Sequence, residues 1–110
     1  MNTISVNNIY FNYIKNNKKT IEGRLNTGKF STFKKGEKLK VVNGDDYIIV
    51  KIKKIRKYLS FEEYLSQEGL KRTLPNIKTI KDGVNIYYNF YTKENEDKYG
   101  ILAIYIKKIS

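Results

Sequence analysis

An almost unbroken apolar run at residues 101–106, Ile-Leu-Ala-Ile-Tyr-Ile, constrains the fold of this chain more than any other feature. A strand with one face in water alternates apolar and polar side chains, so this run predicts a central strand that is buried on both faces. Other material must therefore cover both sides of the sheet. A chain of 110 residues is long enough for one hydrophobic core, and we expect a single domain over residues 1–110.

Four further strands are predicted, at residues 3–6, 19–25, 37–43 and 47–57. The sequence Asn43-Gly44 between the last two is a signal for a tight hairpin. The Ile- and Val-rich run at residues 47–57 is long for one flat strand. Its length predicts a strand that bends across a barrel.

Helical patterns lie between these strands. Asn7 and Asn8 offer a cap for a helix that we expect to end near Asn16 and Asn17, because Asn suits a left-handed turn. Residues 26–35 form a polar loop. Strands around inserted helices indicate an α+β fold.

Three more helical turns are expected before the last strand. Ser60 and Glu63 form a capping box, and Gly69 ends that helix. A second helix opens at Thr79 or Asp82 and carries an apolar stripe, and Thr92 caps a last acidic turn. The stripe consists of Ile80, Val84, Tyr87 and Tyr91.

Composition excludes several classes of protein. The chain has no cysteine and no histidine, which excludes a disulfide framework, zinc sites built on these residues, and Cys/His or Ser/His catalytic pairs. We expect no metal and no cofactor. No apolar run approaches the roughly 18 residues of a membrane span, and the first residues lack the pattern of a signal peptide. We expect an intracellular protein, in the cytoplasm, or in the host cytoplasm or virion if the source is a virus.

The formal net charge of +11 favours polyanionic partners such as RNA. A second explanation is compositional. The excess consists largely of lysine, with Arg24, Arg56 and Arg72 as the arginines, and an AT-rich genome accumulates Lys codons without selection for binding.

The run Lys-Thr-Ile-Glu-Gly-Arg at residues 19–24 carries its charges in the alternation of a strand. In an extended segment Thr20, Glu22 and Arg24 point to one face, with side chains about 6.6 Å apart. Glu22 and Arg24 then offer an acceptor and a planar fork of donors to one ligand, or form an ion pair that only orders the strand. Lys19 joins them only if the strand begins after it.

Asn17, Lys19, Glu22 and Arg24 resemble the G-x-K-x-x-E-x-R motif of the ASCH domain, a relative of the PUA RNA-binding fold. Asn17 stands where the family usually has glycine, and Asn tolerates the left-handed backbone that glycine supplies. The segments that follow the family's order are residues 11–15, 33–39, 58–65, 74–75, 87–92 and 99–104. The resemblance implies a small mixed PUA-like β-barrel with helices packed along one side, and a cleft whose floor carries the motif.

The resemblance also implies roles for the motif residues. Lys19 would meet a phosphate or a developing oxyanion, and Arg24 would grip a phosphate or hold Glu22 in position. Glu22 would accept hydrogen bonds from an exocyclic amine, or act as a base if burial raises its pKa. Thr20, on the same strand face, and Tyr88 complete the set of candidate ligand-binding residues.

The many tyrosines and lysines are a second pattern that is typical of nucleic-acid binding, because bases stack on aromatic rings and phosphates bind cationic side chains. Tyr87 and Tyr91 are four residues apart and are expected to pack a helix on the barrel, whereas Tyr88 either packs in the same way or stacks on a base. The basic run at residues 51–57 supplies candidate contacts to an RNA backbone. These are Lys53, Lys54 and Arg56, although part of the run is ordinary solvated surface.

We therefore expect an RNA- or nucleotide-binding protein, a monomer without membrane partner, in RNA metabolism or translation. The alternatives are a protein-interaction module, or a hydrolase of modified nucleosides or RNA. Some ASCH proteins are similar to amidohydrolases that use a Lys, a Thr two positions before the motif Arg, and a distant Glu. Lys19 matches the Lys, but Glu22 stands where the Thr would be, so no catalytic residue is assigned.

Overall fold

The computed structural model describes residues 1–109 of the chain. Its strands are β1 (Asn2–Ser5), β2 (Ile21–Leu25), β3 (Lys38–Asn43), β4 (Asp46–Tyr58) and β5 (Ile101–Lys108). Its helices are α1 (Asn8–Lys15), α2 (Phe61–Glu68), α3 (Leu70–Thr73), α4 (Ile80–Tyr88) and α5 (Lys93–Tyr99), with a short 3-10 helix, η1, at Gly28–Thr32. The α+β class is confirmed.

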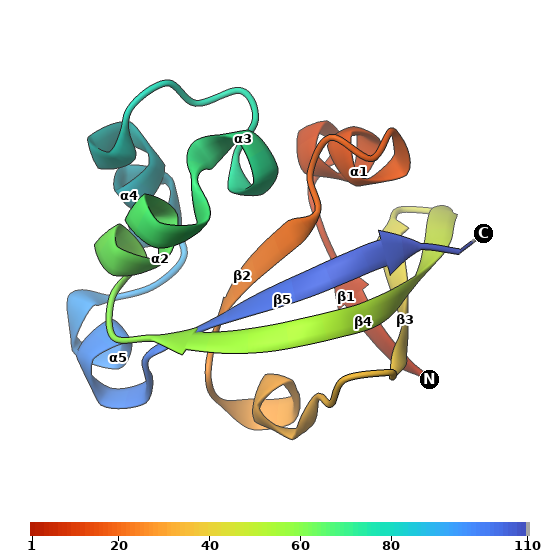
Figure 1. Cartoon of the computed structure of the whole chain (residues 1–110), viewed down its shortest axis with the longest axis horizontal. Coiled ribbons are helices and arrows are strands. Elements are labelled where there is room, and N and C mark those ends of the chain that lie inside the picture. The colour runs from red at the N-terminus through yellow and green to blue at the C-terminus, as the bar shows by residue number, and fades with distance from the viewer. Residues whose placement is uncertain (110) are drawn as a thin grey trace.

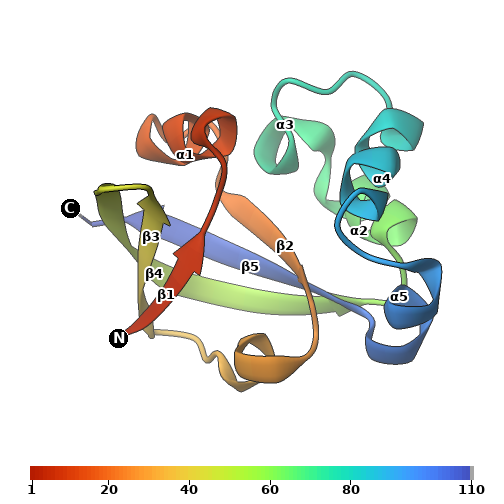
Figure 2. The same cartoon turned by 180° about the vertical axis from the view of Figure 1, so that it is seen from behind.

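The five strands form one sheet in the order β1-β3-β4-β5-β2. β1 runs parallel to β3, and the other neighbours are antiparallel. The sheet curls into a half-barrel, with α2, α3 and α4 together on one side and α1 apart from them above β2 (Figures 1 and 2). β1 and β2 are therefore the two edges of the sheet, and β5 is an inner strand, as its sequence predicts.

The apolar run of β5 is explained by two separate cores. Leu102, Ile104 and Ile106 face the inside of the half-barrel, where they join one cluster. Ile101 and Ala103 belong to a second cluster beneath the helices. Each face of β5 packs against its own apolar cluster. Residues 101–104 and 106 are therefore all apolar, without the polar–apolar alternation of a strand that has one face in water.

β4 bends as expected from its length. Its register against β5 shifts between Ile52 and Lys54, which leaves Lys53 without a partner in the ladder. A bulge of this kind increases the local twist and lets a long strand follow a curved sheet. Because of the shift, Lys54 and Arg56 lie on the helix-covered face of the sheet, opposite Tyr105 and Ala103 in the ladder with β5.

The predicted helix caps are confirmed. The side chains of Asn7, Ser60, Thr79 and Thr92 each accept a hydrogen bond from a backbone N–H of the first turn. The hairpin at Asn43-Gly44 is also confirmed, because Asn43 pairs with Asp46.

Two local expectations differ from the structure. α4 ends at Tyr88, so Tyr91 lies beyond the helix, in a turn where its N–H bonds to the Tyr87 carbonyl. The segment expected to be a plain loop at residues 26–35 contains η1 and buries Phe33. In the described residues, no helix is long and apolar enough to cross a membrane.

Candidate functional site

The edge strands β1 and β2 meet at a seam that side chains close. In the described part of the chain no backbone ladder joins them. Instead, Arg24 Nη2 donates to the Ser5 carbonyl at 2.8 Å, and Lys29 Nζ donates to the Thr3 carbonyl. The candidate site lies beside this seam, and residues of β2, α1 and α4 are among those that line it.

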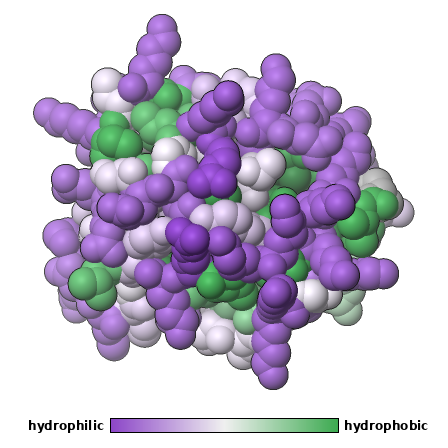
Figure 3. Space-filling model, in the orientation of Figure 1, coloured by the Kyte–Doolittle hydropathy of each residue, from purple (hydrophilic) through white to green (hydrophobic). Residues whose placement is uncertain are grey.

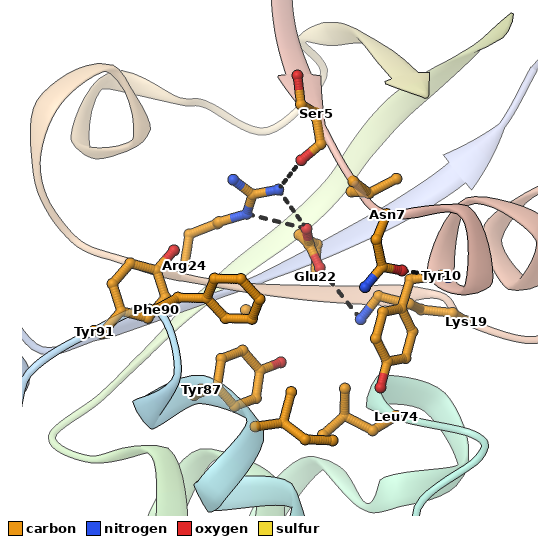
Figure 4. A pocket seen from close by; sticks show the side chains of 13 residues that line it. Ser5, Asn7, Tyr10, Lys19, Glu22, Arg24, Leu74, Tyr87, Phe90 and Tyr91 are labelled. Atoms are coloured by element: carbon orange, nitrogen blue, oxygen red, sulfur yellow. Dashed lines mark hydrogen bonds and ion pairs between the residues drawn. The ribbon is translucent and has the colours of Figure 1, made fainter. Parts of the chain in front are cut away.

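A left-handed turn places Lys19 beside the strand residues. Asn17 adopts φ 60° after α1, as expected from the Asn pair, and β2 begins only at Ile21. Lys19 therefore lies outside the alternation of the strand, and its ammonium reaches Glu22 Oε1 at 3.2 Å. Glu22 and Arg24 share one face of β2, so the three motif side chains meet (Figure 4).

The ammonium of Lys19 is buried and fully bonded. Lys19 is 2% exposed, and its Nζ donates to the carbonyls of Ile21 at 2.8 Å and Thr73 at 2.5 Å, besides contacting Glu22. Burial lowers the pKa of Lys19, although Glu22 opposes the shift. Three acceptors use the three donors of an ammonium, so Lys19 has no hydrogen left for a ligand. It is an anchor that holds β2 to α3.

Glu22 is held by both cations. Its Oε2 accepts from Arg24 Nε at 3.0 Å and from Arg24 Nη2 at 2.8 Å. Burial would raise the pKa of Glu22, but Lys19 and Arg24 outweigh it and lower the pKa below its ordinary value. The carboxylate therefore stays ionised and positions Arg24.

Arg24 is the member of the set with hydrogens to spare. Its side chain is 17% exposed, and its pKa is raised because Glu22 outweighs the opposing effect of burial. Within residues 1–109 its Nη1 forms no hydrogen bond of ordinary geometry, while Nε and Nη2 are both occupied, and the Tyr91 hydroxyl is a nearby side-chain group that interacts with the guanidinium. Two cations and one carboxylate leave one net positive charge. The site therefore attracts an acceptor or an anion through Nη1.

Aromatic and apolar side chains form the rest of the pocket. The cavity is about 210 Å³, and its lining residues are Ser5, Val6, Asn7, Tyr10, Lys19, Glu22, Gly23, Arg24, Leu74, Ile86, Tyr87, Phe90 and Tyr91. This volume lies below the roughly 300–1,000 Å³ of drug-sized sites. One small planar group fits it better than a long ligand.

The rings of the wall differ in how they are held. Tyr87 and Tyr91 stack on Phe61, with interplanar angles of 8° and 19°. The expected packing is confirmed for Tyr87, whereas Tyr91 packs on the same cluster from the turn after α4 and not from the helix; both rings line the pocket as well. Phe90 is 71% exposed although it borders the cavity, and it forms no ring pair within the described residues. Its ring is available to a ligand.

The structure does not bring two of the candidate ligand-binding residues to the pocket. Thr20 connects α3 to β5 through its backbone: its N–H bonds to the Arg72 carbonyl, and its carbonyl accepts from Ile106. Tyr88 donates its hydroxyl to Glu96 at 2.6 Å. This hydrogen bond links α4 to α5. Tyr88 follows the pocket residue Tyr87 by one position, and adjacent residues of a helix point in different directions.

The basic candidates of β4 lie outside the pocket too. Lys54 and Arg56 surround the Tyr105 ring on the sheet, at 4.7 and 5.8 Å from its centre, and Lys53 occupies the bulge. They form a surface of their own.

Sequence reasoning missed much of the pocket wall. Ser5, Asn7 and Tyr10 come from β1 and the start of α1, and Phe90 follows α4. In the sequence, Tyr10 shows only the apolar spacing of a helix with Tyr13 and Ile14, and such spacing indicates packing and not a pocket. Phe90 gave no periodic signal, because it lies in a turn.

Comparisons with known proteins give one matching family model and two similar solved structures. A family model described as the ASCH domain matches residues 4–110. The chain is 41% identical to the hypothetical protein PH0355, whose crystal structure matches with a TM-score of 0.91 over 97% of each chain. It is 38% identical to protein PF0455 from Pyrococcus furiosus, whose solution NMR structure matches with a TM-score of 0.84 over 99% of this chain and 97% of that one.

A more distant likeness shows the fold alone. A mutant of ZmASCH from Zymomonas mobilis has 13% identity and a TM-score of 0.58, over 98% of this chain and 72% of that one. No curated protein matches the sequence significantly.

Proposed function

This chain belongs to the ASCH domain family, and we propose that it binds RNA or a nucleotide by taking one unstacked base into the pocket beside Arg24. The observation that carries the proposal is the unpaired Nη1 of Arg24 at the end of an aromatic-walled cavity. The protein would act in RNA metabolism or translation.

The chemistry of a nucleobase suits this pocket on two counts. A base presents a flat π-face, and stacking on an aromatic side chain is worth about 1–3 kcal/mol per base. Its edge carries carbonyl and ring-nitrogen acceptors of the kind that arginine binds. Phe90 supplies an exposed ring, and Arg24 supplies the donors. Single-stranded RNA offers such bases unpaired.

The hydrolase alternative has less support. Glu22 has a lowered pKa and is held by two cations, which makes it a poor base. Lys19 has no free hydrogen, and Thr20 lies outside the pocket. The groups that the amidohydrolase chemistry would use are therefore engaged or absent from the cavity.

Arg24→Lys tests the proposal directly. Lysine keeps the positive charge but loses the planar fork, so affinity for labelled single-stranded RNA and for a mononucleotide should fall at least tenfold. The matched control is Lys29→Gln, which removes the other side-chain bond across the same seam without touching the pocket. The control should bind within about twofold of the parent, as measured by fluorescence anisotropy at fixed salt.

Phe90→Ala tests the stacking part. The ring is exposed, so its removal should leave the melting temperature unchanged while weakening binding of both ligands. Should the folded parent bind neither ligand at low salt, or should both variants bind like the parent, the pocket is not a nucleotide site.

A further inference from the structure

Lysines face one another across three neighbouring strands. Lys38 of β3 pairs directly with Lys51 of β4, and Lys51 pairs with Lys107 of β5. Residues opposite each other in a ladder project from the same face, so the three ammonium groups form a row. Like charges placed opposite one another destabilise a sheet. An anion bound along the row would relieve this repulsion.

A second cluster of cations surrounds Tyr105 on the same face. Lys54, Arg56 and Arg72 lie 4.7, 5.8 and 5.7 Å from the centre of its ring. Lys54 is the ladder partner of Tyr105, and Lys107 is two residues further along β5, so the row and the cluster are continuous. We call these six cations around Tyr105 the basic platform.

The ring at the centre of the platform is fixed by a buried carboxylate. Tyr105 donates its hydroxyl to Glu68, which also accepts from Tyr58 at 2.6 Å. Glu68 has a side chain that is 1% exposed, and Arg72 reaches it at 3.4 Å. It is the one carboxylate bonded to this cluster in the described residues. One negative charge against so many cations leaves a concentrated positive surplus.

Hydrophilic side chains cover the middle of the face that Figure 3 shows, over β4 and β5. The cations already occupy the surroundings of the Tyr105 ring, so the platform offers charge and not a free face for stacking a base. Phosphate groups, which carry negative charge and accept hydrogen bonds from Arg and Lys, are the counter-charge that this arrangement lacks.

Adjacent residues of α3 contact the platform and the pocket. The Arg72 carbonyl accepts from the Thr20 N–H, and the next carbonyl, that of Thr73, accepts from Lys19. Arg72 thus projects towards Tyr105 while its neighbour anchors the Lys19 that lines the pocket. A strand whose base lies in the pocket would have to pass over α3 to reach the platform.

The geometry points to the platform as the phosphate-binding surface for the single-stranded RNA that continues from the pocket. This inference rests on the proposed function, because it places the neighbouring phosphates of the same strand. It also separates two roles: the pocket holds a base, and the platform holds the backbone. A mononucleotide would then use the pocket alone, whereas an oligonucleotide would use both.

Two double variants test this division, Lys54→Gln with Arg56→Gln, and Lys51→Gln with Lys107→Gln. The matched control is Lys98→Gln, which removes an exposed cation that lies 5.2 Å from the centre of a single ring, Tyr99. The probes are a labelled oligouridylate of about ten nucleotides and uridine monophosphate. Each is titrated at several salt concentrations.

Each double variant should lower oligouridylate affinity about tenfold or more at low salt and leave the affinity for uridine monophosphate unchanged. The slope of log K against log salt should become shallower by about 1.4, because two phosphate contacts are lost at about 0.7 each. The control should keep the slope of the parent.

The possible results separate the two proposals. If the parent binds both probes and the double variants keep its slope, the platform assignment is wrong and the pocket function stands. Equal losses for duplex DNA and for oligouridylate would overturn the assignment to single-stranded RNA. Binding of neither probe by the parent would remove the pocket function and the platform with it.

Discussion

At the scale of single residues, Gly23 shows how closely the motif strand is fitted to its surroundings. It lies between Glu22 and Arg24, and a Cβ on it would be 2.6 Å from the Tyr64 ring. Tyr64 is fully buried beneath β2. A side chain at position 23 would therefore push α2 and β2 apart and displace the two charged residues on either side.

Gly23→Ala should lower the free energy of unfolding by about 1–3 kcal/mol, the usual effect of overpacking a core. For a domain of this size that corresponds to a fall in melting temperature of roughly 4–8 °C per kcal/mol. Tyr64→Leu in the same background frees space and should recover part of the loss, so a double-mutant cycle from thermal melts should show favourable coupling. Strictly additive effects would contradict the contact.

The pH dependence of stability should carry the signature of Glu22. Burial raises its pKa, but Lys19 and Arg24 outweigh burial, and the folded-state pKa is lowered. Its contribution to stability is complete above the unfolded-state pKa of about 4.3 and is lost as the pH falls through the lower folded-state value. Glu22→Gln should be less stable at neutral pH, and its stability should fall less steeply below about pH 4.3.

Urea unfolding at a series of pH values measures this, with the exposed Glu94→Gln as the matched change. The Glu94 variant should follow the parent. Parallel curves for the parent and Glu22→Gln below about pH 4.3 would show that the Glu22 carboxylate is not stabilised by its neighbours.

At the scale of elements, β5 joins the two cores of the molecule. Its alternate side chains reach both clusters, and its neighbours are β4 and β2. The same strand ends in the exposed lysine row. In β5, a charge at the buried Ile104 should therefore be strongly destabilising, whereas a negative charge in place of Lys107 should be favourable.

Ile104→Asp should unfold the domain. Ile104 is fully buried, and an unpaired carboxylate there costs several kcal/mol, comparable with the stability of a small domain. Lys107→Glu, three residues later, should instead raise the melting temperature, because it places opposite charges across the ladder from Lys51. Thermal melts followed by circular dichroism compare the melting temperatures of both variants with that of the parent. An Ile104 variant that melts like the parent would exclude a buried inner strand.

At the scale of the whole molecule, the net charge of +11 acts on folding and on binding in opposite directions. Self-repulsion destabilises the compact state, whereas the same positive field attracts a polyanion. Salt weakens both effects, because the screening length shortens from about 10 Å at 0.1 M to about 3 Å at 1 M.

We therefore expect salt to raise the melting temperature of the free protein over this range while it weakens oligonucleotide binding. Differential scanning fluorimetry and anisotropy at matched ionic strengths measure the two quantities. Lys107→Glu serves as the control, since a lower net charge should reduce the salt dependence of its melting temperature. A melting temperature that is independent of salt would show that self-repulsion does not limit this fold.

Local patterns in the sequence predicted the strands and four of the helices, but neither α3 nor η1. The cap at Ser60, the left-handed turn at Asn17, the hairpin at Asn43-Gly44 and the inner strand at residues 101–106 are all borne out. Each depends on interactions within a few residues of the chain, such as a side chain that caps the next turn or the period of apolar residues. The convergence of Lys19 on Glu22 was also predictable, because the turn before β2 is local.

Which side chains share a surface depends on contacts between segments that are distant in the chain. The bulge in β4 sets which lysines face Tyr105, and a shift of one residue would send them to the other face. Arg72 reaches the same ring from α3, and Phe90 reaches the pocket from a turn after α4. Tyr88, adjacent in sequence to a pocket residue, points to α5 instead. Such sites depend on register and on contacts between distant segments, and local patterns in the chain carry neither.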